Sequence, residues 1–239
     1  MERRFCSASE VGLTFSSVNS SRSEVRYPTS RIVTRWLGRI GFEKALALQE
    51  EIVRSKTSAN EPDELLLLEH EPVYTIGRTP DQSSLRAAGK LPHPVVQTNR
   101  GGQATYHGPG QLVGYPILNL RNRGQDLHRY LRAMEEILIE VLGIHGIPGR
   151  RREGLTGVWV GPRKIASIGV GVRHWISMHG FALNVCGDLS PFYEITPCGI
   201  NGVEMTSVER ECGQAVTVEK SARILEEIFP KRLDALLAG

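Results

Sequence analysis

The stretch GVWVGPRKIASIGV, residues 157–170, decides how the sheet of this protein is predicted. Two apolar runs, residues 157–160 and 165–172, stand on either side of Gly161, Pro162 and Arg163. Glycine and proline favour tight turns, and two apolar runs joined by so short a turn predict a β-hairpin. The sheet is therefore expected to be at least partly antiparallel.

Other segments outside this hairpin predict further strands and three helices. Short apolar or alternating segments bounded by Gly and Pro predict strands at residues 65–68, 73–76, 95–98, 113–120 and 181–185. Apolar residues at helical spacing predict helices over residues 41–53, 127–142 and 218–229, the second capped by Asp126 and stopped by Gly143, the third ended by Pro230. The fold class is an α/β fold of the α+β type, with helices packed on a mixed, partly antiparallel sheet.

Composition narrows the functional classes. The chain has 239 residues, 40% hydrophobic and 23% charged, which is enough for a full core, and its net charge of +3 is too small for a dedicated nucleic-acid binder. A mildly basic protein of this kind would suit an acidic protein partner. No apolar run approaches the roughly 20 residues of a membrane span, so we expect neither a membrane nor a nucleic-acid partner.

The N-terminal segment and the cysteines indicate the domain boundary and the cellular compartment. Residues 1–30 are rich in serine and lack any period, so we expect a disordered extension before one domain at residues 31–239. The cysteines form no C-x-x-C pair and have no paired histidine spacing, which favours free thiols: Cys6, Cys186, Cys198 and Cys212. A cytoplasmic location follows, and an organellar one only if the extension is a transit peptide, against which its acidic residues argue.

The glycine-rich segment NRGGQATYHGPGQLVGYPILNL, residues 99–120, predicts a ligand wall. Its five glycines let the backbone approach a ligand closely and expose N–H groups. Neither G-x-x-x-x-G-K-[ST] nor G-x-G-x-x-G occurs there, so the nucleotide fingerprints are missing. A tight structural turn is the alternative, but Arg100, Tyr106 and His107 add a cation, a phenol and an imidazole that a turn does not need.

Three polar residues near the later strands, Lys164, His179 and Asn184, could each be an ordinary structural residue or part of a site. Lys164 ends the hairpin turn, where most lysines are solvated, but at the start of a buried strand its amine would lose hydration and could exchange protons at neutral pH. His179 precedes a glycine, as turn histidines do. Asn184 is expected to be a satisfied core amide.

Cys198, in ITPCGI at residues 195–200, is the candidate nucleophile. A lone cysteine is usually a small buried hydrophobe, but Pro197 restrains the approach and Gly199 leaves the thiol uncrowded. A reactive thiol needs a neighbouring cation or base. Lys164 is the leading candidate for that neighbour, and His107 and His179 compete with it.

Four motifs in order, RGGQATYHGPGQLVGYPILNL, KIASIGVGV, HGFALNV and PCGI, resemble the octanoyltransferases of lipoate biosynthesis, from about Arg31 to about Val218. The resemblance implies the fold of biotin and lipoate protein ligases, with an acyl pocket at one edge of the sheet. It implies transfer of octanoyl from acyl carrier protein to a lysine of lipoyl domains, namely those of 2-oxoacid dehydrogenase complexes and the glycine cleavage H protein. No cofactor, metal or nucleotide is implied, because the thioester is already activated.

The resemblance also implies site residues. Cys198 matches the nucleophile that becomes the acyl thioester, and Lys164 matches the residue that activates it and serves as general acid and base. Segments that match the lining of the acyl pocket comprise Arg100, Gly101, Gly102, Gln103, Ala104, Thr105, Tyr106, His107, Ser167, Ile168, Gly169, Gly180, Phe181 and Ala182. Backbone N–H groups beside Cys198 or Gly102 are candidates for stabilising the oxyanion.

Three other functions are compatible with parts of this pattern. An ATP-dependent lipoate or biotin ligase would share the fold, but it would need no cysteine, so PCGI favours transfer. A catalytically silent carrier-binding module would not require Lys164 and Cys198 together, and a cysteine hydrolase would need a His–Asn pair in a protease-like context. Arginines that could steer an acidic carrier protein, or be merely solvated, are Arg121, Arg123, Arg129, Arg132 and Arg150 to Arg152.

Overall fold

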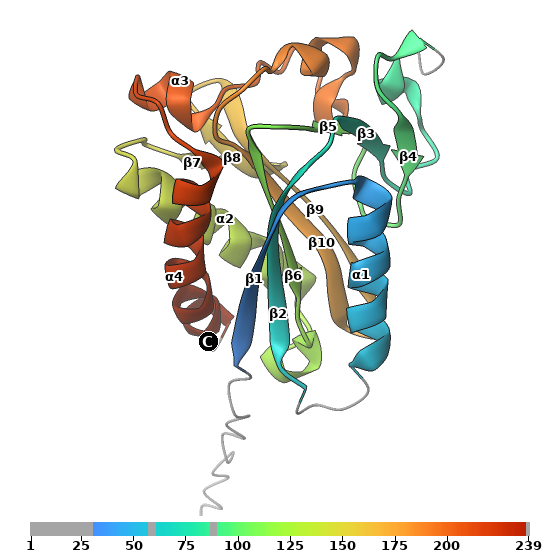
Figure 1. Cartoon of the computed structure of the whole chain (residues 1–239), viewed down its shortest axis with the longest axis vertical. Coiled ribbons are helices and arrows are strands. Elements are labelled where there is room, and N and C mark those ends of the chain that lie inside the picture. The colour runs from blue at the N-terminus through green and yellow to red at the C-terminus, as the bar shows by residue number, and fades with distance from the viewer. Residues whose placement is uncertain (1–30, 57–60, 87–89, 238–239) are drawn as a thin grey trace, which may run out of the picture.

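A seven-stranded mixed sheet forms the centre of the molecule (Figure 1). The structure is a computed structural model that describes residues 31–56, 61–86 and 90–237. From one edge to the other the strands are β1 (Ile32–Ile40), β2 (Asp63–His70), β6 (Gln111–Ile117), β10 (Ile176–Asn184), β9 (Arg163–Arg173), β8 (Leu155–Val160) and β7 (Arg150–Arg152). Only β1 and β2 are parallel among these neighbours, so the predicted mixed, partly antiparallel sheet is confirmed.

The predicted hairpin is present as β8 and β9. These strands pair antiparallel, with Val160 opposite Arg163, and Gly161 adopts a φ of +56° in the turn between them. Glycine reaches such a positive φ without the steric cost that a Cβ brings. The same antiparallel order continues from β9 to β10, which places Gly180 opposite Gly169.

A smaller three-stranded sheet lies beside the large one and contains β4 (Val95–Gln97), β3 (Val73–Ile76) and β5 (Thr105–His107). Strand β3 pairs parallel to β4 and antiparallel to β5. Its apolar side packs into a separate core cluster with Leu85, Phe192 and Ile195.

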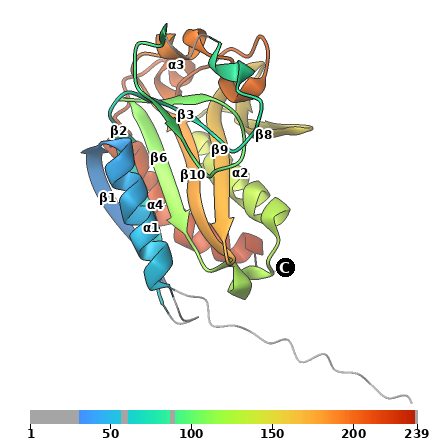
Figure 2. The ribbon, with the colours of Figure 1, turned by 90° about the vertical axis from the view of Figure 1, so that its right-hand side faces the viewer.

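Helices cover both faces of the large sheet (Figures 1 and 2). The α-helices are α1 (Phe42–Ser55), α2 (Leu127–Ile144), α3 (Val208–Cys212) and α4 (Val218–Leu237). Helix α1 packs on β6 and β10, while α2 and α4 pack on each other and on the opposite face. Alternate residues of β2 serve the two faces: Leu65 and Leu67 belong to the core under α2 and α4, and Leu66 and Leu68 to the core under α1.

Helix α2 shows why the sequence forms a helix here. The Asp126 side chain accepts a hydrogen bond from the Arg129 N–H, as the predicted cap requires, and the buried stripe runs through Tyr130, Met134, Ile137 and Val141. The helix continues through Gly143 and ends at Ile144, so the prediction that Gly143 stops it is wrong.

The prediction that the third helix ends at Pro230 is wrong, because α4 continues through Pro230 to Leu237. A proline inside a helix costs roughly 3 kcal/mol. Leu233 and Leu237 lie beyond it and are buried, and each buried leucine contributes roughly 1.5–3 kcal/mol. The apolar stripe therefore outweighs the lost backbone hydrogen bond.

Several elements were not predicted. They are β1, β5, β7, α3 and the 3-10 turns, and β10 begins five residues before the predicted start at residue 181. The predicted Ser-rich extension, residues 1–30, lies outside the described residues.

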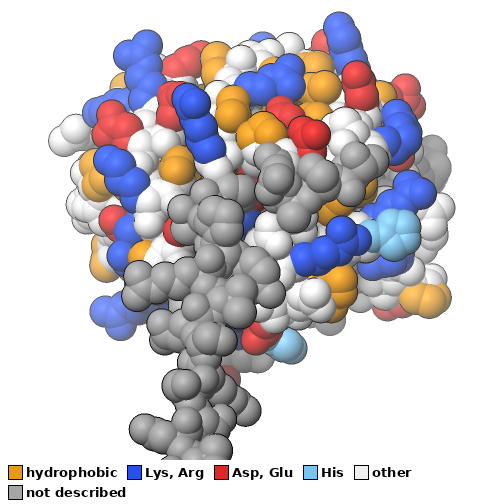
Figure 3. Space-filling model, turned by 90° about the horizontal axis from the view of Figure 1, so that it is seen from below, with side chains coloured by type: hydrophobic (Ala, Val, Ile, Leu, Met, Phe, Trp, Pro, Cys, Tyr) orange, Lys and Arg blue, Asp and Glu red, His pale blue; other side chains and the backbone are white. Residues whose placement is uncertain are grey.

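Among the described residues, the helices are too short or too polar to cross a membrane. Figure 3 shows basic side chains interspersed with acidic ones on the face that it presents.

Candidate active site

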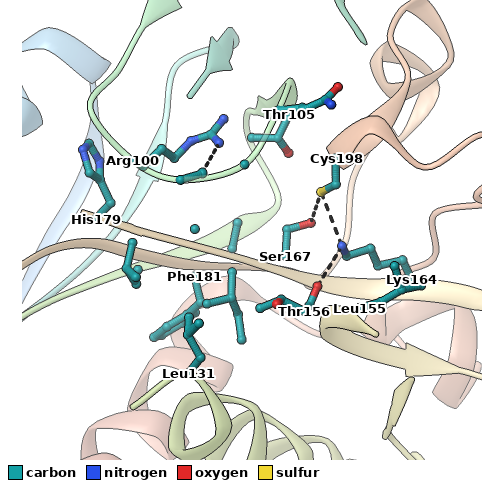
Figure 4. Close-up of a pocket in the computed structure, with 18 of the residues that line it drawn as sticks. Arg100, Thr105, Leu131, Leu155, Thr156, Lys164, Ser167, His179, Phe181 and Cys198 are labelled. Carbon is teal, nitrogen blue, oxygen red and sulfur yellow. Dashed lines mark hydrogen bonds between the residues drawn. The ribbon is translucent and has the colours of Figure 1, made fainter. Parts of the chain in front are cut away.

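The side chains of Cys198 and Lys164 meet in one cavity, as the sequence led us to expect (Figure 4). Lys164 Nζ donates a hydrogen bond to Cys198 Sγ at 3.3 Å and another to the Thr156 carbonyl at 3.1 Å. On its other side, Cys198 Sγ lies 3.7 Å from Ser167 Oγ. A thiol and an amine 34 positions apart in the sequence are thus in direct contact.

Lys164 is held rigidly at the start of β9. Its side chain is 1% exposed, and Nζ lies 4.8 Å from the centre of the Trp159 ring, which belongs to the paired strand β8. Its backbone N–H donates to Glu204 and its carbonyl accepts from Thr206. A Cβ at Gly157 would come within 2.9 Å of Lys164 Cε and 2.5 Å of the Ala166 carbonyl, so only glycine fits beside this lysine.

Cys198 is held in the turn Pro197–Gly199 with a left-handed φ of +55°. This conformation costs a non-glycine residue roughly 1–2 kcal/mol. The Cys198 N–H donates to the Ala104 carbonyl at 2.8 Å and the Gly199 N–H donates to the Thr196 carbonyl at 2.9 Å. The stiff turn predicted around the thiol is present.

These two hydrogen bonds correct one expectation. The sequence makes N–H groups beside Cys198 candidates for stabilising an oxyanion, but those of Cys198 and Gly199 already donate within the protein. For these two groups the expectation is wrong. The corresponding role of Gly102 stays a prediction.

The cavity has a volume of about 330 Å³. Twelve of the fourteen residues predicted to line it do so: Arg100, Gly101, Gly102, Gln103, Thr105, His107, Ser167, Ile168, Gly169, Gly180, Phe181 and Ala182. Ala104 and Tyr106 do not. Along β5 and the residue before it, they alternate with Thr105 and His107 and therefore point to the other side, into the core cluster with Phe192.

Other residues of the cavity wall were not predicted. They include Phe42 and Leu131 from the helical stripes, Tyr115 within the glycine-rich segment, Leu155 and Thr156 just before the predicted strand 157–160, and Ile200 at the end of ITPCGI. An apolar residue on a core-facing stripe carries no sequence signal that separates a cavity wall from a filled core.

Arg100 is a second basic side chain in the cavity wall. It is 8% exposed, and its guanidinium donates to the Thr75 carbonyl and Thr75 Oγ1 at 2.9 and 2.8 Å and to the Gly101 carbonyl at 3.0 Å. Burial lowers the pKa of Arg100, yet a guanidinium remains protonated in proteins. Because no described residue of the wall is Asp or Glu, the charges here favour a bound or developing anion.

His107 and His179 also line the cavity, and the shortest hydrogen bond of each ring goes to an amide oxygen. His107 Nδ1 lies 2.7 Å from Gln111 Oε1, and His179 Nε2 lies 2.5 Å from Asn99 Oδ1. Burial lowers the pKa of His179 to about 4 and that of His107 well below its usual range. Both imidazoles are neutral at pH 7, and neither is the group that contacts the sulfur. Lys164 is therefore the strongest of the three candidates for activating the Cys198 thiol.

Asn184 is a satisfied core amide, as expected. It is 2% exposed, its Nδ2 donates to the Thr206 carbonyl at 3.0 Å, and its Oδ1 accepts from Gln111 Nε2 at 2.9 Å. Its bond to Gln111 in turn orients the amide that holds His107.

One of the arginines that could steer an acidic carrier protein, or be merely solvated, does neither. Arg123 is buried, and it forms ion pairs with Asp63 and Asp234, so the expectation is wrong for this residue. Arg132 and Arg151 pair with Glu135, whose carboxylate is buried.

Within the described residues, no group of three or more His, Cys, Asp or Glu side chains is arranged to hold a metal ion.

Comparison with known proteins gives matches over most of the chain. A family model described as the lipoyl protein ligase A/B catalytic domain matches residues 42–230. An octanoyltransferase of Geobacter metallireducens is 48% identical over 206 residues, which are 86% of this chain and 95% of that protein. One of Syntrophotalea carbinolica is 52% identical over 190 residues, 79% of this chain and 89% of that protein.

Solved structures share the fold at low sequence identity. A bipartite lipoate protein ligase of Thermoplasma acidophilum superposes with a TM-score of 0.67 at 21% identity, over 85% of this chain and 83% of that chain. LipL1 of P. falciparum, solved with lipoate, has a TM-score of 0.68 at 15% identity, over 85% of this chain and 63% of that one. The expected fold of lipoate protein ligases is confirmed.

Proposed function

Because the chain belongs to the family of lipoyl protein ligase A/B catalytic domains, and curated relatives covering most of its length are octanoyltransferases, we infer that it is an octanoyltransferase that acts in protein lipoylation. We propose further that Cys198 carries the octanoyl group as a thioester. The contact of 3.3 Å between Lys164 Nζ and Cys198 Sγ is the observation that supports this mechanism.

The first step loads the enzyme. Lys164 takes the proton of Cys198, and the thiolate attacks the carbonyl carbon of an octanoyl thioester. A carbon–sulfur bond to Cys198 forms, and the carbon–sulfur bond to the carrier breaks. The departing carrier thiolate takes its proton from the Lys164 ammonium, which leaves a neutral amine beside the acyl-enzyme.

The second step makes the amide. The acceptor lysine, having lost one proton to solvent, attacks the thioester carbonyl and gives a second proton to Lys164. The carbon–nitrogen bond forms, the bond to Cys198 breaks, and the thiolate and ammonium are restored. Exchange of one thioester for another is nearly neutral in energy, whereas formation of the amide is favourable, so the second step drives the first.

Carrier, acceptor and compartment complete the proposal. The donor is octanoyl-acyl carrier protein, and the acceptors are lipoyl domains of 2-oxoacid dehydrogenase complexes and the glycine cleavage H protein. Residues 31–239 act as one catalytic domain. We place the reaction in the cytoplasm, where a free catalytic thiol stays reduced.

An ATP-dependent ligase of the same fold is the rival function. One of the structural neighbours is a lipoate-protein ligase bound with ATP. A ligase activates a free acid as an adenylate and needs no thiol at this position. The contact of Cys198 with a buried lysine therefore favours transfer from a thioester.

Mass spectrometry of an unmodified lipoyl domain tests the proposal. Incubation with wild-type enzyme and octanoyl-acyl carrier protein should add one octanoyl group to the domain without ATP. Cys198→Ser and Lys164→Ala should each reduce the rate by at least about 100-fold. Transfer from free octanoate that strictly requires ATP would instead establish the ligase.

A further inference from the structure

The small sheet turns one face toward the cavity. Side chains alternate along a strand. Ala104, just before β5, and Tyr106 point into the core cluster, whereas Thr105 and His107 line the cavity. Thr75 stands opposite Thr105 on β3, and its side chain lies on the same face, where it contacts Arg100 and His107.

The two threonines of this face differ in their hydrogen bonds. Thr75 Oγ1 accepts a bond from Arg100 at 2.8 Å. Thr105 Oγ1 is buried, and within the described part of the chain it has no hydrogen-bond partner, although the residue is only 6% exposed. A buried hydroxyl without a partner costs roughly 1–3 kcal/mol. Such a group at the wall of a cavity is a candidate for binding a partner that arrives with the substrate.

The position of Thr105 relative to the nucleophile is fixed by the backbone. The carbonyl of the preceding residue, Ala104, accepts the Cys198 N–H at 2.8 Å, which ties the start of β5 to the turn that carries the thiol. Thr105 and Cys198 line the same cavity, and Figure 4 shows them near each other at the same end of it.

The proposed acyl transfer requires a hydrogen-bond donor close to the Cys198 sulfur. Attack of Cys198 on a thioester turns the carbonyl oxygen into an oxyanion, which needs preorganised hydrogen-bond donors. In many such sites the N–H groups of the nucleophile and its neighbour serve. Here those of Cys198 and Gly199 already donate to Ala104 and Thr196.

We propose that Thr105 Oγ1 donates a hydrogen bond to the carbonyl oxygen of the octanoyl group and stabilises the oxyanion that forms on attack by Cys198. The hydroxyl keeps its proton throughout, because it only donates the hydrogen bond. The inference rests on the proposed octanoyl transfer and adds a catalytic residue to it. It also explains why a buried hydroxyl stands at this position where an apolar side chain of the same shape would fit.

Three substitutions separate the hydroxyl from the methyl group of Thr105. Thr105→Val keeps the shape and loses the hydroxyl, Thr105→Ser keeps the hydroxyl, and Thr105→Ala loses both. In single-turnover acylation by octanoyl-acyl carrier protein, followed by intact mass, T105V and T105A should be about 100-fold slower than wild type. T105S should stay within several-fold of wild type.

Stability provides the control against a merely structural role. T105V should unfold at the same or a higher denaturant concentration than wild type, because it removes an unpaired buried hydroxyl. Should T105V fail to fold, T105A and T105S still decide whether the rate depends on the hydroxyl.

A spectroscopic measurement reports on the hydrogen bond directly. With octanoyl labelled with ¹³C at the carbonyl, the infrared C=O stretch of the acyl-enzyme should lie at higher frequency in T105V than in wild type. A wild-type acylation rate in T105V, or an unchanged stretch, would overturn the inference and leave the proposed function intact. If the wild type forms no acyl-enzyme at all, the proposed function fails together with this inference.

Discussion

At the scale of single residues, the site depends on a lysine that is almost wholly removed from water. Lys164 is 1% exposed, and its amine is shared between the Thr156 carbonyl and Cys198 Sγ. A cation at this distance stabilises an anionic sulfur, and the anion is the reactive form of a thiol. The charge of Lys164 should therefore govern how fast Cys198 reacts, even with a reagent unrelated to the substrate.

Replacement of Lys164 by methionine tests this dependence. K164M keeps an unbranched side chain but removes the charge, so we expect alkylation of Cys198 by iodoacetamide at pH 7 to slow by about tenfold or more. The reaction is followed by peptide mass mapping, which separates Cys198 from the other cysteines. Lys220→Met, at an exposed position of α4, is the matched control and should react as wild type does. Equal rates in K164M and wild type would show that Lys164 does not activate the thiol.

At the scale of elements, the cavity is formed where β6, β9 and β10 pair closely. A Cβ at Gly180 of β10 would lie 2.3 Å from the Gly114 carbonyl of β6 and 2.5 Å from Pro116 Cδ. The glycine thus lets the two strands approach each other. It also lets the neighbouring residues Phe181 and Ala182 line the cavity.

Gly180→Ala should accordingly disrupt the pairing of β6 and β10. We expect a loss of at least about 2 kcal/mol in the free energy of unfolding, measured by urea denaturation, because the added Cβ would meet rigid backbone and ring atoms. Gly143→Ala, in the exposed last turn of α2, is the matched control. Nothing lies within 4 Å of its added Cβ, so it should be neutral or up to about 1 kcal/mol more stable. A G180A protein as stable as wild type would contradict this description of the sheet.

The elements that could be predicted are those whose pattern is local. The hairpin of β8 and β9, with Gly161 and Pro162 between two apolar runs, and the capped stripe of α2 both follow from short-range chemistry. Strand β1 was missed because it is an edge strand whose residues are mostly half-buried or exposed, so its hydrophobic alternation is weak. Helix α4 passes Pro230 because its apolar stripe is buried by elements distant in sequence, which no local rule reports.

The same contrast between local patterns and contacts distant in sequence applies to the residues of the candidate site. Cys198, Lys164 and twelve wall residues lie in motifs rich in Gly, Pro and polar residues, and these could be singled out. Phe42 and Leu131 reach the cavity from helices α1 and α2, where they look like ordinary core residues. The available N–H groups around Cys198 depend on which carbonyls lie opposite, and the sequence does not show that.

At the scale of the whole molecule, a buried cluster of rings joins α1 to both sheets. His70 Nε2 lies 2.7 Å from the Tyr115 hydroxyl, and its ring packs against those of Phe42 and His107. Burial lowers the pKa of His70 to about 4, as it does for His179 on β10, which is separated from β2 by β6. The folded protein therefore keeps these histidines neutral under conditions in which an unfolded chain would protonate them.

This difference makes stability depend on pH. Between the ordinary histidine pKa of 6.5 and about 4, the unfolded state binds protons that the folded state does not, so stability is complete above pH 6.5 and falls as the pH drops. Each histidine contributes up to about 1.4 kcal/mol per pH unit in this window. Urea denaturation between pH 7 and pH 4 should show a shallower decline for His70→Gln than for wild type. Parallel curves would show that His70 is not kept neutral by the fold.

The central claim is that Cys198 carries the acyl group. Intact mass spectrometry of the enzyme after brief mixing with octanoyl-acyl carrier protein, without an acceptor, tests it most directly. We predict one added octanoyl group in wild type, removed by hydroxylamine as thioesters are, and none in Cys198→Ala. An adduct that persists in Cys198→Ala, or normal transfer to a lipoyl domain by that variant, would contradict the claim.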